Sequence, residues 1–292
     1  MRLLWAAGCG VRPGYPILGV VVRRVLVAAS AAVLLCAGCS TSTKSHSPTP
    51  ADTPRPSAAS SSPGDAGALV RAAVAATRAT TARIDEKIEV GDERGSFPLT
   101  VTGDFDMAAD RGRLAVDFPG GAISHLDEVF AGDTVYLRNN KNTPHGWNML
   151  ERAAAQSHYL LRAPVNDPEH VLAQIALMRR VTHSGQDTIN GTRCVRYRGV
   201  LDHAAITLRL SATVREQADA ARSELGTDLP VHAEAWTDPH GRLVRARLSF
   251  NAGTAHLTTT LSLSDLGKPV TITPPAATDA QPVTVTGGVL PG

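Results

Sequence analysis

The sequence predicts an α+β fold in which an antiparallel sheet has helices on one of its faces. Apolar residues recur at every second position in many short runs, and turn-forming residues separate these runs. Helical spacing of apolar residues is confined to one segment in front of the strands and two segments inserted among them. About ten strands with so few helices is the pattern of a sheet covered on one face.

The first half of the folded region is predicted to be a helix followed by a meander of strands. Residues 68–82 place Leu69, Val70, Ala73, Val74 and Thr77 on one helical face. Turn formers such as Gly91-Asp92, Gly120-Gly121 and Gly132-Asp133 separate the runs that follow. The alternating apolar residues of those runs are Phe97, Leu99, Val101, Phe105 and Met107, then Leu114, Val116 and Phe118, then Val135 and Leu137.

The second half begins with a predicted helix and continues with strands. Asp167-Pro168-Glu169 opens the helix with proline in its first turn, and Arg179 and Arg180 are expected at its C-terminus. Strands are predicted at 181–188 and 192–201, joined by Asn190-Gly191, a strong hairpin signal. A helix over 213–225 precedes strands at 231–237, 243–250 and 254–263, the first two joined by Asp238-Pro239-His240-Gly241.

The N-terminus has the features of a secretory signal peptide. Arg23 and Arg24 precede a short apolar run, and the chain then reads VLLCAGC at 33–39. The run is too short for the roughly 20 apolar residues of a membrane span. The segment before Cys39 resembles a bacterial lipobox, so residues 1–38 are expected to be removed and Cys39 to be lipidated. Residues 1–21 are not needed for such a leader, so translation is expected to start near Val22.

The composition of the mature chain argues against a nucleic-acid-binding protein and against an intramolecular disulfide. Removing the leader takes four arginines from 29 basic residues and leaves 25, against 27 acidic ones, a net charge of −2. No basic tract remains, which argues against nucleic-acid binding. Cys194 is the one cysteine left after Cys39, so no intramolecular disulfide is expected, and its place on a predicted strand favours a small buried residue.

Two segments flank the predicted domain at 68–274. Residues 39–67 are rich in Ser, Thr, Pro and Ala and have almost no large apolar side chain, so a disordered tether is expected. With about 30 Å of average reach, the tether would hold the domain off the membrane surface. The tail at 275–292 has a similar composition and is expected to be flexible, unless Val283 and Val285 add a short edge strand.

No arrangement of residues indicates an enzyme or a bound cofactor. The sequence contains neither a Gly-x-Ser-x-Gly motif nor a P-loop. Its histidines are scattered without metal-ligand spacing, so no metal site is expected. The acidic pairs Asp85-Glu86 and Asp127-Glu128 have the residue types of acid/base catalysis, but their turn or strand context favours solvated charges.

Four segments and one downstream tryptophan resemble a known family. They are GQDTINGTRCVRY at 185–197, LPVHAEAWTD at 229–238 followed by GRLVR at 241–245, LSLSDLGKPVTI at 261–272, and GDTVY at 132–136 with Trp147. These hairpin and turn patterns resemble actinobacterial lipoproteins of the LppX/LprG type, relatives of the LolA lipoprotein carriers. The resemblance implies a strongly curved antiparallel half-barrel whose helices cover the concave face around an apolar cavity.

The resemblance also implies a function. The protein would bind acyl chains of a membrane lipid or lipoglycan in the cavity, and would carry or present them. It would be a monomer anchored through Cys39 on the outer face of the cytoplasmic membrane, with an envelope transporter or another membrane protein as partner. The residues expected to line the cavity are Phe97, Leu99, Val101, Phe105, Val116, Val171, Leu172, Ile175, Val195, Tyr197, Leu208, Leu248, Phe250 and Leu261.

One alternative from another class remains open at this point. A lipoprotein of this kind could instead be an envelope adaptor that binds another protein and has no lipid cargo. Its interior would then be filled at ordinary packing density. The sequence does not distinguish a packed core from a cavity, because both require the same apolar residues.

Overall fold

The computed structural model describes residues 63–93, 95–119, 124–139 and 146–284. The strands are β1 (Thr81–Asp92), β2 (Gly95–Asp106), β3 (Arg111–Asp117), β4 (His125–Ala131), β5 (Thr134–Asn139), β6 (Trp147–Glu151), β7 (Arg179–Ile189), β8 (Thr192–Leu201), β9 (Val231–Thr237), β10 (Leu243–Ala252), β11 (Ala255–Ser264) and β12 (Ala280–Pro282). The α-helices are α2 (Pro63–Arg78), α3 (Pro168–Ala176), α4 (His203–Ile206) and α5 (Ala212–Leu225). Short 3₁₀ turns are η1 (Arg152–Ala154), η2 (Pro164–Asn166) and η3 (Ala277–Asp279).

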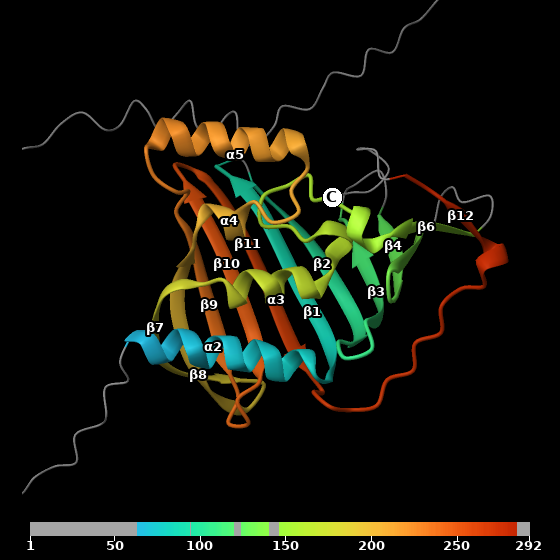
Figure 1. Ribbon diagram of the computed structural model, residues 1–292, viewed down its shortest axis with the longest axis horizontal. Helices are drawn as coiled ribbons and strands as arrows, with labels where there is room; N and C mark the ends of the chain where they lie inside the picture. The colour runs from blue at the N-terminus through green and yellow to red at the C-terminus, as the bar shows by residue number, and fades with distance from the viewer. Residues whose placement is uncertain (1–62, 94, 120–123, 140–145, 285–292) are drawn as a thin grey trace, which may run out of the picture.

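These strands form one open, half-barrel-like sheet in the order β12-β6-β5-β4-β3-β2-β1-β11-β10-β9-β8-β7. Every pairing is antiparallel except that of β12 with β6. Two meanders, β1 to β6 and β7 to β11, are joined where β1 pairs with β11. Helices α2 and α3 cross the same face of the sheet, and α5 lies along one end of the strands (Figure 1). The predicted α+β class is therefore confirmed.

The helix at the start of the domain and the strand after it differ from the prediction. Helix α2 begins at Pro63 and ends at Arg78, earlier at both ends than the predicted 68–82. The β-branched Thr80 and Thr81 favour the extended strand β1, which the prediction missed. Strand β1 lies at the middle of the sheet, with Ala82, Ile84 and Ile88 buried.

Helix α3 begins as predicted and ends sooner. Asp167 is its N-cap and accepts a hydrogen bond from the backbone N–H of Glu169 at 3.1 Å, and Pro168 is its first residue. The helix ends at Ala176, and Arg179 and Arg180 belong to strand β7. The two arginines therefore follow the helix and do not form its last turn, because Arg179 already pairs with Val200 of β8.

Local turn chemistry agrees with the structure in the second half. Asn190 and Gly191 both have positive φ and join β7 to β8, as a two-residue hairpin requires. The Asp238 carboxylate accepts from the backbone N–H groups of His240 and Arg242, both at 2.9 Å, and closes the turn between β9 and β10. In the tail, β12 pairs with β6, and the Val283 N–H donates to the Met149 carbonyl at 2.8 Å.

The main core lies between the sheet and the helices. It includes inward-facing residues of most strands together with apolar residues of α2, α3 and α5. A second, small cluster of Ile189, Cys194, Trp236 and Val244 is separate from it. Cys194 is a buried free thiol whose pKa is raised by burial, in agreement with the prediction of a small buried residue.

Candidate functional site

The structure brings most of the predicted cavity residues together. Eleven of the fourteen predicted residues belong to the buried core between the sheet and the helices: Leu99, Val101, Phe105, Val116, Val171, Leu172, Ile175, Tyr197, Leu248, Phe250 and Leu261. Val195 is partly buried and packs against them. Cys39 lies outside the residues that the structure describes.

Two of the predicted cavity residues do not lie in this interior. Phe97 is 72% exposed, because the first four residues of β2 extend past the part of the sheet that other elements cover. Alternation assigns Phe97 to the same face as Val101, but it does not show how much of that face other elements cover. Leu208 is half-buried and lies in a turn after α4, outside the core cluster.

The segment between β6 and α3 crosses over the inner face of the sheet. Leu160, Leu161, Ala163 and Val165 are buried there, and the Leu161 carbonyl accepts from the Thr259 hydroxyl of β11 at 2.7 Å. Leu161, Val165 and Asn166 all have left-handed backbones, with φ of 57°, 47° and 51°. Such φ values are costly for residues other than glycine, above all for β-branched valine, so tertiary contacts fix this segment.

Two glutamates also face this interior. Glu86 of β1 is 0% exposed and Glu128 of β4 is 1% exposed. The expectation that both are solvated charges is therefore wrong. Glu86 shares its strand face with Ile84 and Ile88, and its cross-strand neighbours are Val101 and Leu261. Glu128 shares its face with Leu126 and Phe130. The alternation along each strand therefore places the glutamate on the same face as the buried apolar residues.

Few polar groups contact these carboxyl groups. Oε1 of Glu128 accepts from the Asn166 side-chain amide at 2.9 Å. Nη2 of Arg162 donates to Oδ1 of the same asparagine at 3.2 Å, and its guanidinium lies over the Phe118 ring at 5.6 Å. Among the described residues, both oxygens of Glu86 and Oε2 of Glu128 have no hydrogen-bond partner. Buried polar atoms rarely remain unpartnered, so these three require an explanation.

Burial controls the protonation of the acidic pair. Removal from water raises the pKa of Glu86 to about 8, with a smaller opposing effect of the positive charge on Arg162. Burial likewise raises the pKa of Glu128 to about 8, against the Asn166 hydrogen bond and Arg162, while the charges of Asp167 and Glu86 add to it. Burial also lowers the pKa of Arg162. Both acids are therefore mainly neutral near pH 7.

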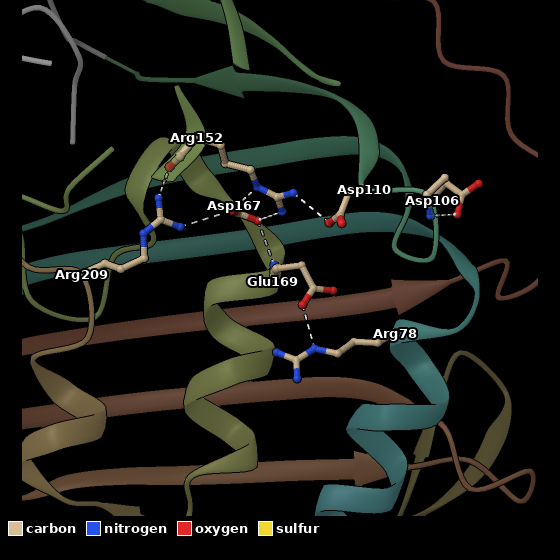
Figure 2. Close-up of polar contacts among 8 residues, drawn as sticks. Arg78, Asp106, Asp110, Arg152, Asp167, Glu169 and Arg209 are labelled. Carbon is tan, nitrogen blue, oxygen red and sulfur yellow. Dashed lines mark hydrogen bonds and ion pairs between the residues drawn. The ribbon is translucent and has the colours of Figure 1, made fainter. Parts of the chain in front are cut away.

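A network of ion pairs fixes α3 over this interior (Figure 2). The carboxylate of Asp167, 2% exposed, accepts from Nε and Nη2 of Arg152, both at 2.8 Å, and lies 3.5 Å from Nη1 of Arg209. Glu169, in the first turn of α3, pairs with Nε of Arg78 at the end of α2 at 2.7 Å. Arg152 also pairs with the exposed Asp110 at 2.9 Å. The N-terminus of α3 is thus tied directly to η1 and α2, and through Arg152 to the loop before β3.

The arrangement has no feature of a metal centre or a membrane span among the described residues. No group of three or more His, Cys, Asp or Glu side chains in the described ranges could hold a metal ion. None of the helices described is long and apolar enough to cross a membrane. What this interior provides is a buried apolar core with one polar cluster inside it.

This chain is similar in sequence to known lipoproteins. The sequence profile of the LppX_LprAFG lipoprotein family matches residues 65–272. The lipoarabinomannan carrier protein LprG of Mycolicibacterium smegmatis is 26% identical over 261 residues, which is 88% of this chain and 97% of that protein. Among solved structures, LprF from Mycobacterium bovis (18% identity, TM-score 0.46) covers 74% of this chain and 99% of its own. The Mycobacterium tuberculosis lipoprotein LppX (14% identity, TM-score 0.41) covers 73% and 100%.

The family profile extends from within α2 to the segment after β11, and so includes strands β1 to β11 and the helices between them. The hairpin at Asn190-Gly191, the tryptophan strand β9 and the closing segment after β11 all fall inside the matched range. The chain belongs to the LppX_LprAFG lipoprotein family.

Proposed function

We propose that this protein is a lipid carrier that binds acyl chains between the inner face of its sheet and helix α3. The observation behind this proposal is the single apolar interior to which β2, β3, α3, β10 and β11 all contribute. A family relative named as a lipoarabinomannan carrier supports a lipid or lipoglycan as ligand. The proposed activity is binding and transfer, with no chemical step and no cofactor.

Acyl chains would be held by burial of apolar surface, which stabilises a complex by about 25 cal/mol per Å². Branched and aromatic side chains such as Val101, Ile175 and Phe250 offer such surface without directional bonds. The deep interior would therefore discriminate little between chains of similar length. Selection of one lipid over another requires polar contacts, of which the interior has few.

We also propose that Cys39 anchors the protein on the outer face of the cytoplasmic membrane, with the domain on a tether. Cys39→Ala is expected to release the protein from the membrane fraction while the domain stays folded, because two or three acyl chains at Cys39 would supply the stable attachment. Cell fractionation together with circular dichroism measures both properties. A Cys39→Ala protein that remains in the membrane fraction would contradict lipid anchoring at this residue.

Filling the interior tests the carrier proposal. Val101→Trp and Ile175→Trp place an indole ring at fully buried positions of β2 and α3. Both are expected to lower binding of a fluorescent fatty-acyl probe at least tenfold. Phe97→Trp is the matched control, since this side chain is exposed on the same strand as Val101 and its variant should bind like wild type.

The result depends on whether the interior contains a cavity large enough for the tryptophan side chains. In a cavity, both variants fold with near wild-type stability and lose the probe. In a solid core, each would overpack its surroundings and lose about 1–3 kcal/mol or more of stability. Variants that lose this stability, with a wild-type protein that does not bind the probe, would refute the carrier proposal and favour an envelope adaptor without lipid cargo.

A further inference from the structure

We propose that Glu86, Glu128 and Arg162 form a polar subsite inside the apolar interior that binds a hydroxyl group on an acyl-chain ligand. This inference rests on the proposed lipid-binding function and specifies the chemistry that the interior selects. No hydrogen bond between described residues joins the subsite to the ion-pair network around Asp167 that holds the N-terminus of α3.

The three residues reach the interior from different elements. Glu86 comes from β1, Glu128 from β4, and Arg162 from the segment that crosses the sheet before α3. Strands β2 and β3 separate β1 from β4, and their inward residues Val101, Val116 and Leu114 are apolar and buried. The polar cluster is thus surrounded by the apolar residues that are proposed to contact acyl chains.

Neither carboxyl group is fully satisfied by the residues that the structure describes. Glu86 and Glu128 do not hydrogen-bond to each other, since Oε2 of Glu128 and both oxygens of Glu86 have no partner among the described residues. Leaving a buried donor or acceptor unpaired costs free energy, because the group has lost its hydrogen bonds to water. A ligand group that pairs with these oxygens recovers that free energy, and a plain hydrocarbon chain does not.

The distribution of donors and acceptors specifies a hydroxyl. Oε1 of Glu128 already accepts from Asn166, so the proton of the neutral acid lies on Oε2, which becomes a donor toward the interior. Glu86 in its neutral form presents one donor and one acceptor oxygen. A hydroxyl can accept from the protonated oxygen of either acid and can donate to the acceptor oxygen of Glu86. A ligand anion would meet the acceptor oxygen of Glu86, and an ester carbonyl would leave it unpaired.

Matched probes test the subsite in the mature chain carrying Cys39→Ala. Methyl stearate is compared with methyl hydroxystearates that have the hydroxyl at different carbons, each measured by displacement of a fluorescent acyl probe. At least one hydroxylated isomer is expected to bind wild type about three- to tenfold more tightly than methyl stearate, the gain of about one buried hydrogen bond. Glu86→Leu and Glu86→Met should bind both esters equally, and Asp85→Asn, on the exposed face of the same strand, should keep the preference.

Each result bears on one proposal or the other. Methyl stearate binding without preference for any hydroxylated isomer overturns the subsite and leaves the carrier proposal standing. Tighter binding of the stearate anion than of every hydroxylated ester also overturns it, because the subsite would then take an anion. If no ester displaces the probe, the carrier proposal fails and the subsite fails with it. Two apolar replacements of Glu86 keep the test valid if one of them does not fold.

Discussion

Asp167→Ala is expected to lower the free energy of unfolding by about 3–5 kcal/mol. Removing one partner of a buried ion pair leaves the other charge without compensation, which accounts for most of this loss. Asp167 is 2% exposed and pairs with Arg152, whose side chain is 12% exposed and also lies over the rings of Phe105 and Phe130. The same carboxylate caps α3, a contribution of about 1 kcal/mol.

Two further variants separate the causes of this loss. Asp167→Asn keeps an acceptor for the cap but removes the charge, so an intermediate loss is expected. Asp110→Asn removes the exposed partner of Arg152 and should change stability by about 1 kcal/mol or less. Urea unfolding followed by circular dichroism measures all three. An Asp167→Ala loss no larger than that of Asp110→Asn would show that this network does not hold α3 in place.

The second large effect concerns pH. The ordinary pKa of a glutamate is 4.5, and burial raises the pKa of Glu86 and of Glu128 to about 8. Between these values the folded state binds more protons than the unfolded state, so the free energy of unfolding falls as pH rises through this window. The slope is about 1.4 kcal/mol per pH unit for each acid that stays protonated. The charged groups that act on the pair are Arg162 and Asp167, in addition to the two acids themselves.

Glu86→Gln is expected to make the free energy of unfolding less dependent on pH, by the contribution of one of the two acids. The variant should be close to wild type in stability near pH 5 and more stable by several kcal/mol near pH 9, because a neutral amide never has to lose a proton in the interior. Asp85→Asn, exposed on the same strand, is the control and should follow the wild-type profile. Parallel profiles for wild type and Glu86→Gln from pH 5 to 9 would mean that Glu86 is not buried as described.

Elements defined by local chemistry could be predicted from the sequence. The Asn190-Gly191 hairpin, the Asp167-Pro168 helix start and the Asp238 turn each depend on backbone preferences and hydrogen bonds within a few residues. Strand β1 could not be predicted in this way, because charged residues alternate with its apolar ones and an inward glutamate interrupts the apolar set. Its place at the centre of the sheet is set by pairing with β11, far away in the sequence.

The burial of Glu128, Arg162 and Asn166 was also not predicted from the sequence. Alternation shows that Glu128 shares a strand face with Leu126 and Phe130, and this was the available signal for its burial. Arg162 and Asn166 lie in a segment without periodicity, whose left-handed residues depend on tertiary contacts. Phe97 illustrates the opposite error, since its alternation is regular but no element covers that end of β2.

The central claim is that the interior holds acyl chains, and the lipid content of the protein itself tests it most directly. Cys39→Ala protein purified from its host has no lipid anchor, so any acyl chain seen by mass spectrometry under non-denaturing conditions must be a ligand. We expect a bound lipid in this protein and its loss when Ile175→Trp is added. A lipid-free protein, together with an Ile175→Trp variant that fails to fold, would show that the interior is a packed core and that the protein is not a carrier.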